Sequence, residues 1–420
     1  MGLMTDTLRY VPHTTLDATM ISPASRATES VVPPPPASLN PAMTRRSTVL
    51  PRVEWSGEQA NVVPFERERF EEVRALGQGG MGEVVLLKDH DIERMVALKR
   101  LPEAPDADRV MRFVEEVRTV GQLDHPNIVP VHDVGVDHLG RYYFVMKHLQ
   151  GETLESIIER LRQGDAAAHA RFPFRIRVEV FLGVLNAVTY AHRKGVIHRD
   201  LKPANIMVGP YGEVTVVDWG LARRLDTPDV MTRNGSAVED PPDMRAGGSR
   251  RTQLGTVVGT PLYMSPEQAR GQHDQVDVRS DIYSLSVLFH EFLYLSHYLD
   301  GKETLVDVLE GVQHTQPAFC HRKTHALQPV VPAEYSYLME KGLAKDPAQR
   351  FQTVEEMAEE LRGALDGRIH VRCQRTMVKR GLHEALRRAD EHPLAMLLGG
   401  LAVTGLALAL VVHLVWLLMS

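Results

Sequence analysis

A glycine-rich segment near residue 80 has the residue types and spacing of a loop that binds phosphate. Residues 76–84 read LGQGGMGEV, in which Gly77, Gly79 and Gly82 follow a G-x-G-x-x-G spacing. Glycine lets the backbone approach a phosphate closely and turn its N–H groups toward it. A dinucleotide-binding fold would continue from such a loop directly into a helix. Residues 84–88 are strand-like instead, which argues against dinucleotide binding.

Lys99 is the first side chain placed to neutralise the charge of a phosphate. It ends a short apolar strand-like run, 17 residues after Gly82, and its ammonium can reach phosphates beneath the glycine loop. A lysine at the end of a strand commonly just extends into solvent, so this interpretation requires a carboxylate that fixes the ammonium. The helix expected over residues 108–123 offers Glu115 and Glu116. Glu116 is favoured because it lies at the edge of the apolar face.

A second group of polar residues lies at residues 198–205, which read HRDLKPAN, and at residues 218–220, which read DWG. Three further motifs follow in the chain: GTPLYMSPE at 259–267, SDIYS at 280–284 and DPAQR at 346–350. In this order the motifs resemble those of eukaryotic-type protein kinases over about residues 65–362. The wordings GQGGMGEV, HRDLKPANI and YMSPEQ are most similar to the bacterial Ser/Thr protein kinases.

The resemblance implies a role for each polar residue of the central motifs. Asp200 is expected to accept the proton of the substrate hydroxyl, and Lys202 to stabilise the γ-phosphate of ATP. Asn205 and Asp218 would bind Mg²⁺, with Mn²⁺ as an alternative, because their oxygen atoms suit hard cations. Lys99 would hold the α- and β-phosphates. Lysine in the D-L-K-P-x-N pattern implies that the substrates are Ser and Thr residues of proteins.

The resemblance extends to residues that would surround ATP and support the site. The ATP-binding residues it implies are Leu76, Gly77, Gln78, Gly79, Gly80, Met81, Gly82, Val84, Ala97, Lys99, Glu116, Met146, Lys147 and His148, the last three in the hinge between two lobes. The supporting residues it implies are a buried Glu267–Arg350 ion pair, Asp281 beneath the catalytic loop, and His198 as a packed core residue. Trp219 replaces the usual Phe of D-F-G but leaves the metal ligand and the glycine in place.

Activation is expected to involve phosphorylation. Arg199 precedes Asp200. In related kinases this arginine commonly forms an ion pair with a phosphorylated residue of the activation segment, and the added negative charge orders that segment. We expect autophosphorylation chiefly at Thr252 and secondly at Thr256, which mass spectrometry of the active protein would detect. Residues 227–250 read as a flexible insertion in this segment.

The elements that must position these residues form an α+β arrangement. Strand-like runs at 70–76, 84–88 and 95–99 precede the helix 108–123, two more strand-like runs follow, and the pattern is mostly helical after about residue 153. This is the bilobal protein-kinase fold that the resemblance implies, with a strand-rich N-lobe and a helical C-lobe. Hydrophobic residues make up 43% of the 420 residues and charged residues 24%, as in globular proteins. The net charge of −6 gives no indication of a nucleic-acid partner, and the two cysteines suggest neither a disulfide framework nor a zinc site.

The two ends of the chain differ in composition. Residues 1–64 are rich in Pro, Ser and Thr and are expected to be disordered. Residues 363–393 form a basic juxtamembrane connector. Residues 394–419 contain no Asp, Glu, Lys or Arg, and this run exceeds the roughly 20 apolar residues that span a bilayer. A buried core helix is the alternative. We expect a single-pass, tail-anchored protein of the cell membrane, with the kinase domain in the cytoplasm because the basic flank precedes the apolar run.

Two classes of function fit this organisation. An active kinase that signals and autophosphorylates explains the complete set Lys99, Asp200, Asn205 and Asp218. A catalytically inactive kinase-fold scaffold on the membrane is the alternative, although such proteins usually lack a member of the set. The resemblance also allows a homodimer formed through the kinase domain. Transfer of phosphate by the purified protein distinguishes an enzyme from a scaffold.

Overall fold

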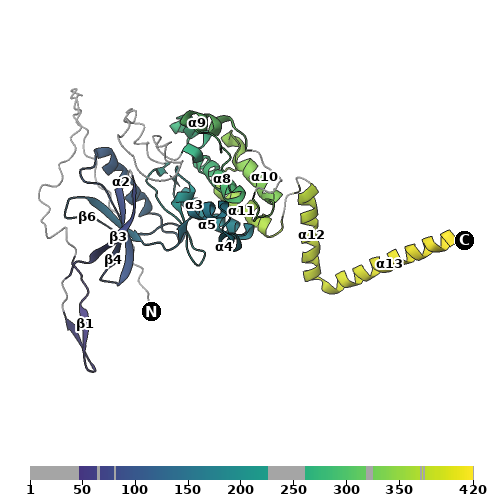
Figure 1. Ribbon diagram of the computed structural model, residues 1–420, viewed down its shortest axis with the longest axis horizontal. Coiled ribbons are helices and arrows are strands. Elements are labelled where there is room, and N and C mark those ends of the chain that lie inside the picture. Colours follow the sequence, from purple (N-terminus) through teal and green to yellow (C-terminus); the bar gives the residue numbers. More distant parts are fainter. Residues whose placement is uncertain are drawn as a thin grey trace, which may run out of the picture. The chain divides into compact units, whose positions relative to one another are not determined.

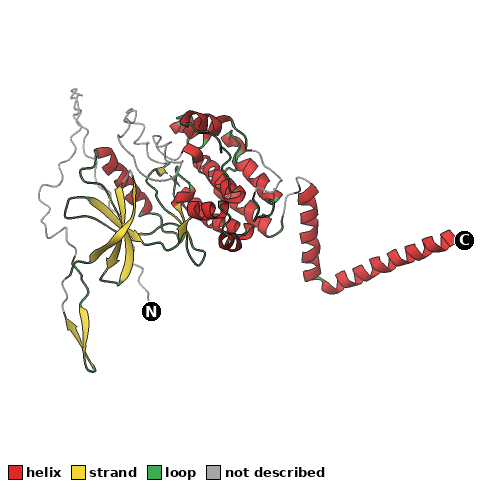
Figure 2. Ribbon diagram, in the orientation of Figure 1, coloured by secondary structure: helices red, strands yellow, loops and turns green. Residues whose placement is uncertain are grey.

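The computed structural model describes residues 47–63, 67–79, 82–225, 261–317, 325–368, 371 and 374–419. Within them the chain is α+β: most strands precede residue 150 and most helices follow it (Figures 1 and 2). The strands are β1 (Arg52–Ser56), β2 (Gln59–Val63), β3 (Phe70–Gly79), β4 (Gly82–Asp89), β5 (Arg94–Arg100), β6 (Val131–Val136), β7 (Tyr142–Lys147), β8 (Glu152–Thr153), β9 (Val196–Ile197), β10 (Ile206–Val208), β11 (Val214–Val216) and β12 (Arg223–Arg224). The helices are α2 (Ala107–Val120), α3 (Leu154–Arg162), α4 (Ala166–Arg171), α5 (Phe174–Arg193), α7 (Pro266–Ala269), α8 (Val278–Tyr294), α9 (Leu305–His314), α10 (Ala333–Gly342), α11 (Val354–Leu365), α12 (Gln374–Glu391) and α13 (Pro393–Met419). Short 3-10 turns lie at η1 (Pro203–Asn205), η3 (Pro261–Tyr263), η4 (His273–Gln275) and η5 (Pro347–Gln349).

The N-lobe is a five-stranded antiparallel sheet in the order β3-β4-β5-β7-β6. Alternating side chains of β4, β5 and β7 form one apolar cluster, as the two-residue period of a strand requires. On α2, Phe113 packs against Phe144 of β7, with ring centroids 5.5 Å apart. The side chain of Asp106 caps α2 by accepting the N–H of Arg109. The sheet therefore fixes β5, and α2 is held beside it.

A β-hairpin precedes this sheet, where the sequence analysis expected disorder throughout residues 1–64. Strands β1 and β2 pair through a two-residue turn in which Gly57 has a φ of +64°, a value that glycine adopts at low cost. The hairpin is attached to the sheet because Asp91 accepts the N–H groups of Val49 and Leu50. The expectation of disorder was therefore wrong for residues 52–63, whereas residues 1–46 lie outside the described residues.

The C-lobe is built around α5 and α8, which share the main apolar core. Phe181 of α5 stacks on Phe289 of α8 at a centroid distance of 4.2 Å. Every residue of α8 from Ser280 to Tyr294 is buried. A helix that is buried on all sides can hold a charged group only if that group is paired. Asp281, one turn from the start of α8, meets this requirement in the site described below.

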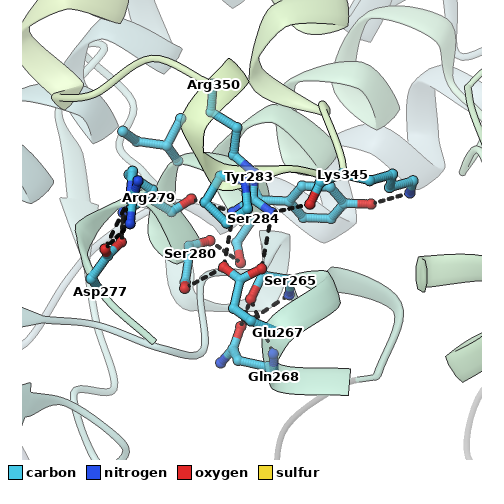
Figure 3. Close-up of polar contacts among 12 residues, drawn as sticks. Ser265, Glu267, Gln268, Asp277, Arg279, Ser280, Tyr283, Ser284, Lys345 and Arg350 are labelled. Carbon is cyan, nitrogen blue, oxygen red and sulfur yellow. Dashed lines mark hydrogen bonds and ion pairs between the residues drawn. The ribbon is translucent and has the colours of Figure 1, made fainter. Parts of the chain in front are cut away.

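A buried ion pair joins α7 to the segment before α11 (Figure 3). The guanidinium of Arg350 donates to both carboxylate oxygens of Glu267 at 2.9 Å, and Ser280 donates to Glu267 at 2.6 Å. The side chains of Arg350 and Glu267 are 0% and 3% exposed. Burial favours the neutral acid, but the hydrogen bonds and charge of Arg350 outweigh it and lower the pKa of Glu267. The pair predicted from the sequence is thus present.

The chain continues beyond the core into two further helices. Much of the segment that the sequence analysis expected to be a basic connector forms helix α12. Helix α13 covers residues Pro393–Met419. Across the stretches of chain that the structure describes, no helix combines the length and the apolarity needed to cross a membrane. The transmembrane helix expected for residues 394–419 is therefore not shown and stays a prediction.

Removing Arg350 should destabilise the fold far more than removing an exposed arginine. We expect Arg350→Ala to lower the free energy of unfolding by about 3–5 kcal/mol, because the Glu267 carboxylate is left buried and unpaired. Arg175→Ala, which breaks an exposed pair with Glu179, should cost about 1 kcal/mol or less. Equilibrium urea unfolding measures both variants. Equal losses would contradict the assignment.

The same pair should contribute to acid sensitivity. Because the pKa of Glu267 is lower when folded than its ordinary 4.5, its stabilisation is complete above that value and is lost as the pH falls through the folded pKa. Glu267→Gln should therefore flatten this part of the dependence of unfolding free energy on pH.

Candidate active site

The ammonium of Lys99 is fixed by a carboxylate from α2. Lys99 lies on β5, paired with Val84 of β4 and Phe144 of β7. Its Nζ donates to the two carboxylate oxygens of Glu116 at 2.6 and 2.9 Å. Glu116 is buried, whereas Glu115 is exposed, because α2 turns only the former toward the sheet. The structure thus brings together the Lys99–Glu116 pair that the sequence favoured.

Asp218 supplies a second carboxylate to the same ammonium. Its Oδ1 accepts from Lys99 Nζ at 3.2 Å, which joins residues 119 positions apart. Burial favours the neutral amine, but the charges of Glu116 and Asp218 outweigh it and raise the pKa of Lys99. The Lys99 charge in turn outweighs burial at Asp218 and lowers the pKa of that carboxyl. Lys99 is therefore a cation, and Asp218 an anion, across the neutral pH range.

The catalytic-loop residues predicted from the sequence also lie together. Lys202 Nζ donates to Asp200 Oδ2 at 2.6 Å. Asn205 Nδ2 donates to the backbone oxygen of Asp200 at 3.0 Å, from the 3-10 turn η1 that Pro203 begins. The backbone oxygen of Asn205 accepts the N–H of Val217, the residue before Asp218. The motifs HRDLKPAN and DWG therefore lie next to each other in one site.

A buried carboxylate beneath the loop holds its backbone. Asp281 of α8 accepts the N–H groups of His198 and Arg199 at 2.8 and 2.9 Å. It also accepts His192 Nε2 at 2.8 Å. Although burial favours the neutral acid, the hydrogen bond and charge of His192 lower the pKa of Asp281. Asp281 is therefore an anion that fixes the two residues preceding Asp200, as the resemblance implied.

Two supporting residues were missed in the sequence. Gln268 of α7 donates from Nε2 to the backbone oxygen of Arg199 at 3.0 Å, which connects the Glu267–Arg350 clamp to the catalytic loop. His192 holds Asp281 from the end of α5. The sequence showed only that Gln268 is next to Glu267. The contacts of Gln268 with Arg199 and of His192 with Asp281 do not follow from local spacing.

Trp219 and His198 pack against each other inside the core. Their ring centroids are 4.5 Å apart, and both side chains are buried. Burial lowers the pKa of His198, so its ring is neutral and serves as packing. Trp219 shares its apolar cluster with Val120 at the end of α2. The larger ring is therefore accommodated within the main apolar core.

The remaining predicted residues lie along the sheet. Leu76 to Gly79 end β3, and Gly82 begins β4 with a φ of +129°, where a Cβ would lie 2.0 Å from a backbone oxygen. Ala97 pairs with Met146 across β5 and β7; Lys147 ends β7, and His148 follows. Gly80, Met81, Thr252, Thr256 and residues 227–250 lie outside the described residues, so the predictions on them stay predictions.

The family follows from comparison with known proteins. Residues 70–361 match the model of the protein kinase domain, which is more than half of the chain. The chain belongs to the protein kinase family. It is 34% identical over 320 residues to the serine/threonine-protein kinase PknD of Protochlamydia amoebophila, covering 74% of this chain and 31% of that protein. It is 34% identical to the probable serine/threonine-protein kinase SCO3848 of Streptomyces coelicolor over 71% of this chain and 40% of that protein, and 33% identical to the probable serine/threonine-protein kinase PknB of Bifidobacterium longum over 72% and 40%. The chain thus spans about a third to two fifths of the length of these curated relatives.

The oxygen atoms of this kinase site suit a hard divalent cation that also binds phosphate oxygens. Asp218 offers a carboxylate and Asn205 an amide oxygen, both types that Mg²⁺ accepts. Among the described residues, no group of three or more His, Cys, Asp or Glu side chains could hold a metal ion. A cation held through Asn205 and Asp218 would also take phosphate oxygens and water as ligands, because Mg²⁺ usually keeps several waters in phosphoryl-transfer sites.

Replacing Glu116 should lower the pKa of Lys99. We expect Glu116→Gln to shift the pH dependence of Lys99 acylation to lower pH, because a negative charge within 3 Å is removed. The exposed neighbour provides a matched control, and Glu115→Gln should leave the curve in place. Mass spectrometry of the acylated protein across pH measures both. A shift of the same size in the two variants would exclude a specific pair.

Proposed function

We propose that this chain is an ATP-dependent Ser/Thr protein kinase. The observation that carries the proposal is the Lys99 ammonium held between Glu116 and Asp218, next to a loop in which Lys202 contacts Asp200. Phosphoryl transfer asks a protein mainly to position reactants and to neutralise charge. These residues provide both. The names of the relatives, all serine/threonine-protein kinases, support the class of substrate.

Each residue has a defined task in this proposal. Asp200 orients the substrate hydroxyl and accepts its proton, and the Lys202 ammonium neutralises charge on the γ-phosphate. Lys99 holds the α- and β-phosphates, with its position set by Glu116. Mg²⁺ held through Asn205 and Asp218 would supply charge neutralisation on the phosphates when bound, and Mn²⁺ could replace it.

Asp200→Asn should separate phosphoryl transfer from folding and binding. The amide keeps the shape of the side chain but cannot take the proton, so we expect kcat to fall by roughly 10²- to 10⁴-fold. Thermal unfolding and ATP affinity should stay close to those of the wild type. Transfer of ³²P from ATP to a Ser/Thr substrate by the full chain measures the rate, and a chelator should abolish it.

Two results would contradict the proposal. One is an undiminished rate in Asp200→Asn. The other is a wild-type protein that binds ATP with Mg²⁺ yet transfers no phosphate to itself or to a substrate, which would favour the inactive scaffold.

We further propose that residues 394–419 attach the kinase to a membrane, with the kinase domain on the cytoplasmic side. No Asp, Glu, Lys or Arg interrupts this run. The described side chains of α13 are largely exposed, including Leu406 at 70% and Trp416 at 64%, which is unfavourable in water. The preceding basic residues favour the cytoplasmic side for the domain.

Charged substitutions within α13 should release the protein from membranes. An arginine near the bilayer centre costs about 2.5–3.5 kcal/mol, so Leu406→Arg/Leu410→Arg should move much of the protein from the carbonate-resistant to the soluble fraction. Leu139→Arg/Leu327→Arg is the matched control, because both leucines are half-exposed elsewhere on the chain. Equal fractionation of all variants, or cleavage of the kinase domain by protease added outside intact cells, would refute the arrangement.

A further inference from the structure

Helix α12 has one apolar face and one polar face. At about 100° per residue, Met377, Val378, Leu382 and Leu386 fall on one half of the helix surface, with Gly381 and Ala385 between them. The four large side chains are 55–66% exposed. The apolar face of this helix is therefore turned to its surroundings along its whole length.

The polar face of α12, by contrast, is the one that contacts the kinase domain. Thr376 is 1% exposed, and Lys379 forms an ion pair with Glu334 of α10. The ring of His383 lies against Gly367, so closely that a Cβ on this glycine would be 2.7 Å from it. Thr376 and His383 lie on the side of the helix opposite Val378, and Lys379 lies at the edge of the polar face, next to Leu386.

This orientation is the reverse of the usual one. A surface helix of a globular domain normally buries its apolar stripe against the core and leaves its polar face in water. Full burial of a Leu, Val or Met side chain is worth about 1.5–3 kcal/mol relative to exposure. Transfer of the exposed apolar face of α12 from water to an apolar phase would therefore be favourable by several kcal/mol.

The charges on α12 indicate what that phase is. Residues 374–391 contain five Lys or Arg (Arg375, Lys379, Arg380, Arg387 and Arg388) and three Asp or Glu (Glu384, Asp390 and Glu391), a net charge of 5 − 3 = +2. Arg375 and Arg388 project near the two margins of the apolar face, from where long side chains reach phosphate headgroups. Basic residues that border an apolar face are typical of helices that lie in the surface of an anionic membrane.

The position of α12 in the chain points to the same occupant. Only His392 separates its end at Glu391 from the start of α13 at Pro393. If α13 enters the bilayer, the C-terminal end of α12 lies close to the headgroups. A membrane surface is therefore available to the apolar face without any further partner.

We propose that α12 lies in the cytoplasmic surface of an anionic bilayer, with Met377, Val378, Leu382 and Leu386 at the boundary between headgroups and acyl chains and its polar face toward the kinase domain. The inference rests on the proposed membrane attachment. It adds a second lipid contact that reaches the C-lobe, through Lys379 and Glu334.

Site-specific fluorescence on the full chain tests the proposal. Cys320 and Cys373 are replaced by Ser, and a polarity-sensitive dye is attached to Leu382→Cys on the apolar face, to Arg380→Cys on the polar face or to Leu408→Cys in α13. Leu382 and Arg380 are both exposed in the structure, so the protein alone gives no difference between them. The protein is reconstituted into phosphatidylcholine vesicles with or without phosphatidylglycerol, and lipids with spin labels at shallow or deep positions quench the dye.

The proposal expects a different pattern at each position. In vesicles with phosphatidylglycerol, the dye at position 382 should be blue-shifted and quenched by the shallow label, and the dye at position 380 should not. The shift at position 382 should be smaller in pure phosphatidylcholine, because each Lys or Arg near an anionic surface contributes about 1 kcal/mol. Deep quenching at position 408 reports insertion of α13 independently.

Each other outcome has a definite meaning. Deep quenching at position 408 with unquenched dyes at 380 and 382 would uphold the membrane attachment and overturn the role of α12. A dye at position 382 that is shielded from aqueous iodide but not quenched by lipid would overturn it in favour of a second copy of the chain. Quenching at 382 without quenching at 408 would support the surface helix and refute the membrane-spanning α13.

A charge-matched pair of variants provides a second test, read from a dye on Val378→Cys. Leu382→Glu/Leu386→Glu and Arg380→Glu both change the net charge by −2, but only the first places charge on the apolar face. We expect the double variant to abolish quenching at position 378 and Arg380→Glu to reduce it only in part. Equal effects would mean that electrostatic attraction alone holds the helix, which would overturn the buried apolar face.

Discussion

The ammonium of Lys99, held between two carboxylates, is the interaction on which the geometry of this kinase depends. It joins β5 to α2 through Glu116 and to the DWG motif through Asp218, so three segments far apart in sequence converge on one atom. The two carboxylates differ in environment, because Glu116 is buried, which raises its pKa, whereas the negatively charged Asp218 side chain is 41% exposed. Because Asp218 is also a predicted metal ligand, a divalent ion held there would neutralise part of this charge.

Backbone strain is a second constraint on the active site, in the catalytic loop and in the DWG motif. Arg199 and Asp218 both have positive φ, +69° and +59°, a region that costs a non-glycine residue about 1–3 kcal/mol. At Arg199 the conformation is maintained by three bonds, since Asp281 accepts its N–H, Gln268 donates to its oxygen, and Asp281 also accepts the N–H of His198. Glu267 and Arg350 fix the helix that carries Gln268. The buried charges of the C-lobe therefore help to hold the position of Asp200 through the backbone of the residues before it.

Much of this could be predicted from the sequence because kinase motifs place their polar residues at short, fixed spacings. The helical period favoured Glu116 over Glu115, and the apolar clusters of the sheet follow the strand pattern. The hairpin at residues 52–63 was missed because its attachment to the sheet, through Asp91 and the N–H groups of Val49 and Leu50, joins residues some 40 positions apart. Contacts such as Lys99–Asp218, 119 residues apart, arise only when both lobes are folded. The spacing of residues along the chain does not predict such long-range pairs, and only the resemblance to a known family does.

The attachment of α12 shows how a weak contact can still set an orientation. An ion pair whose lysine is 41% exposed and a single buried threonine stabilise a helix by only about 1–2 kcal/mol. Four apolar side chains that leave water contribute several times as much. In the proposed arrangement lipid therefore determines where the helix lies, and the polar contacts determine which side of the C-lobe faces the membrane. A change in lipid charge would then alter how strongly α12 is held at the membrane surface, without any change in the residues that transfer phosphate.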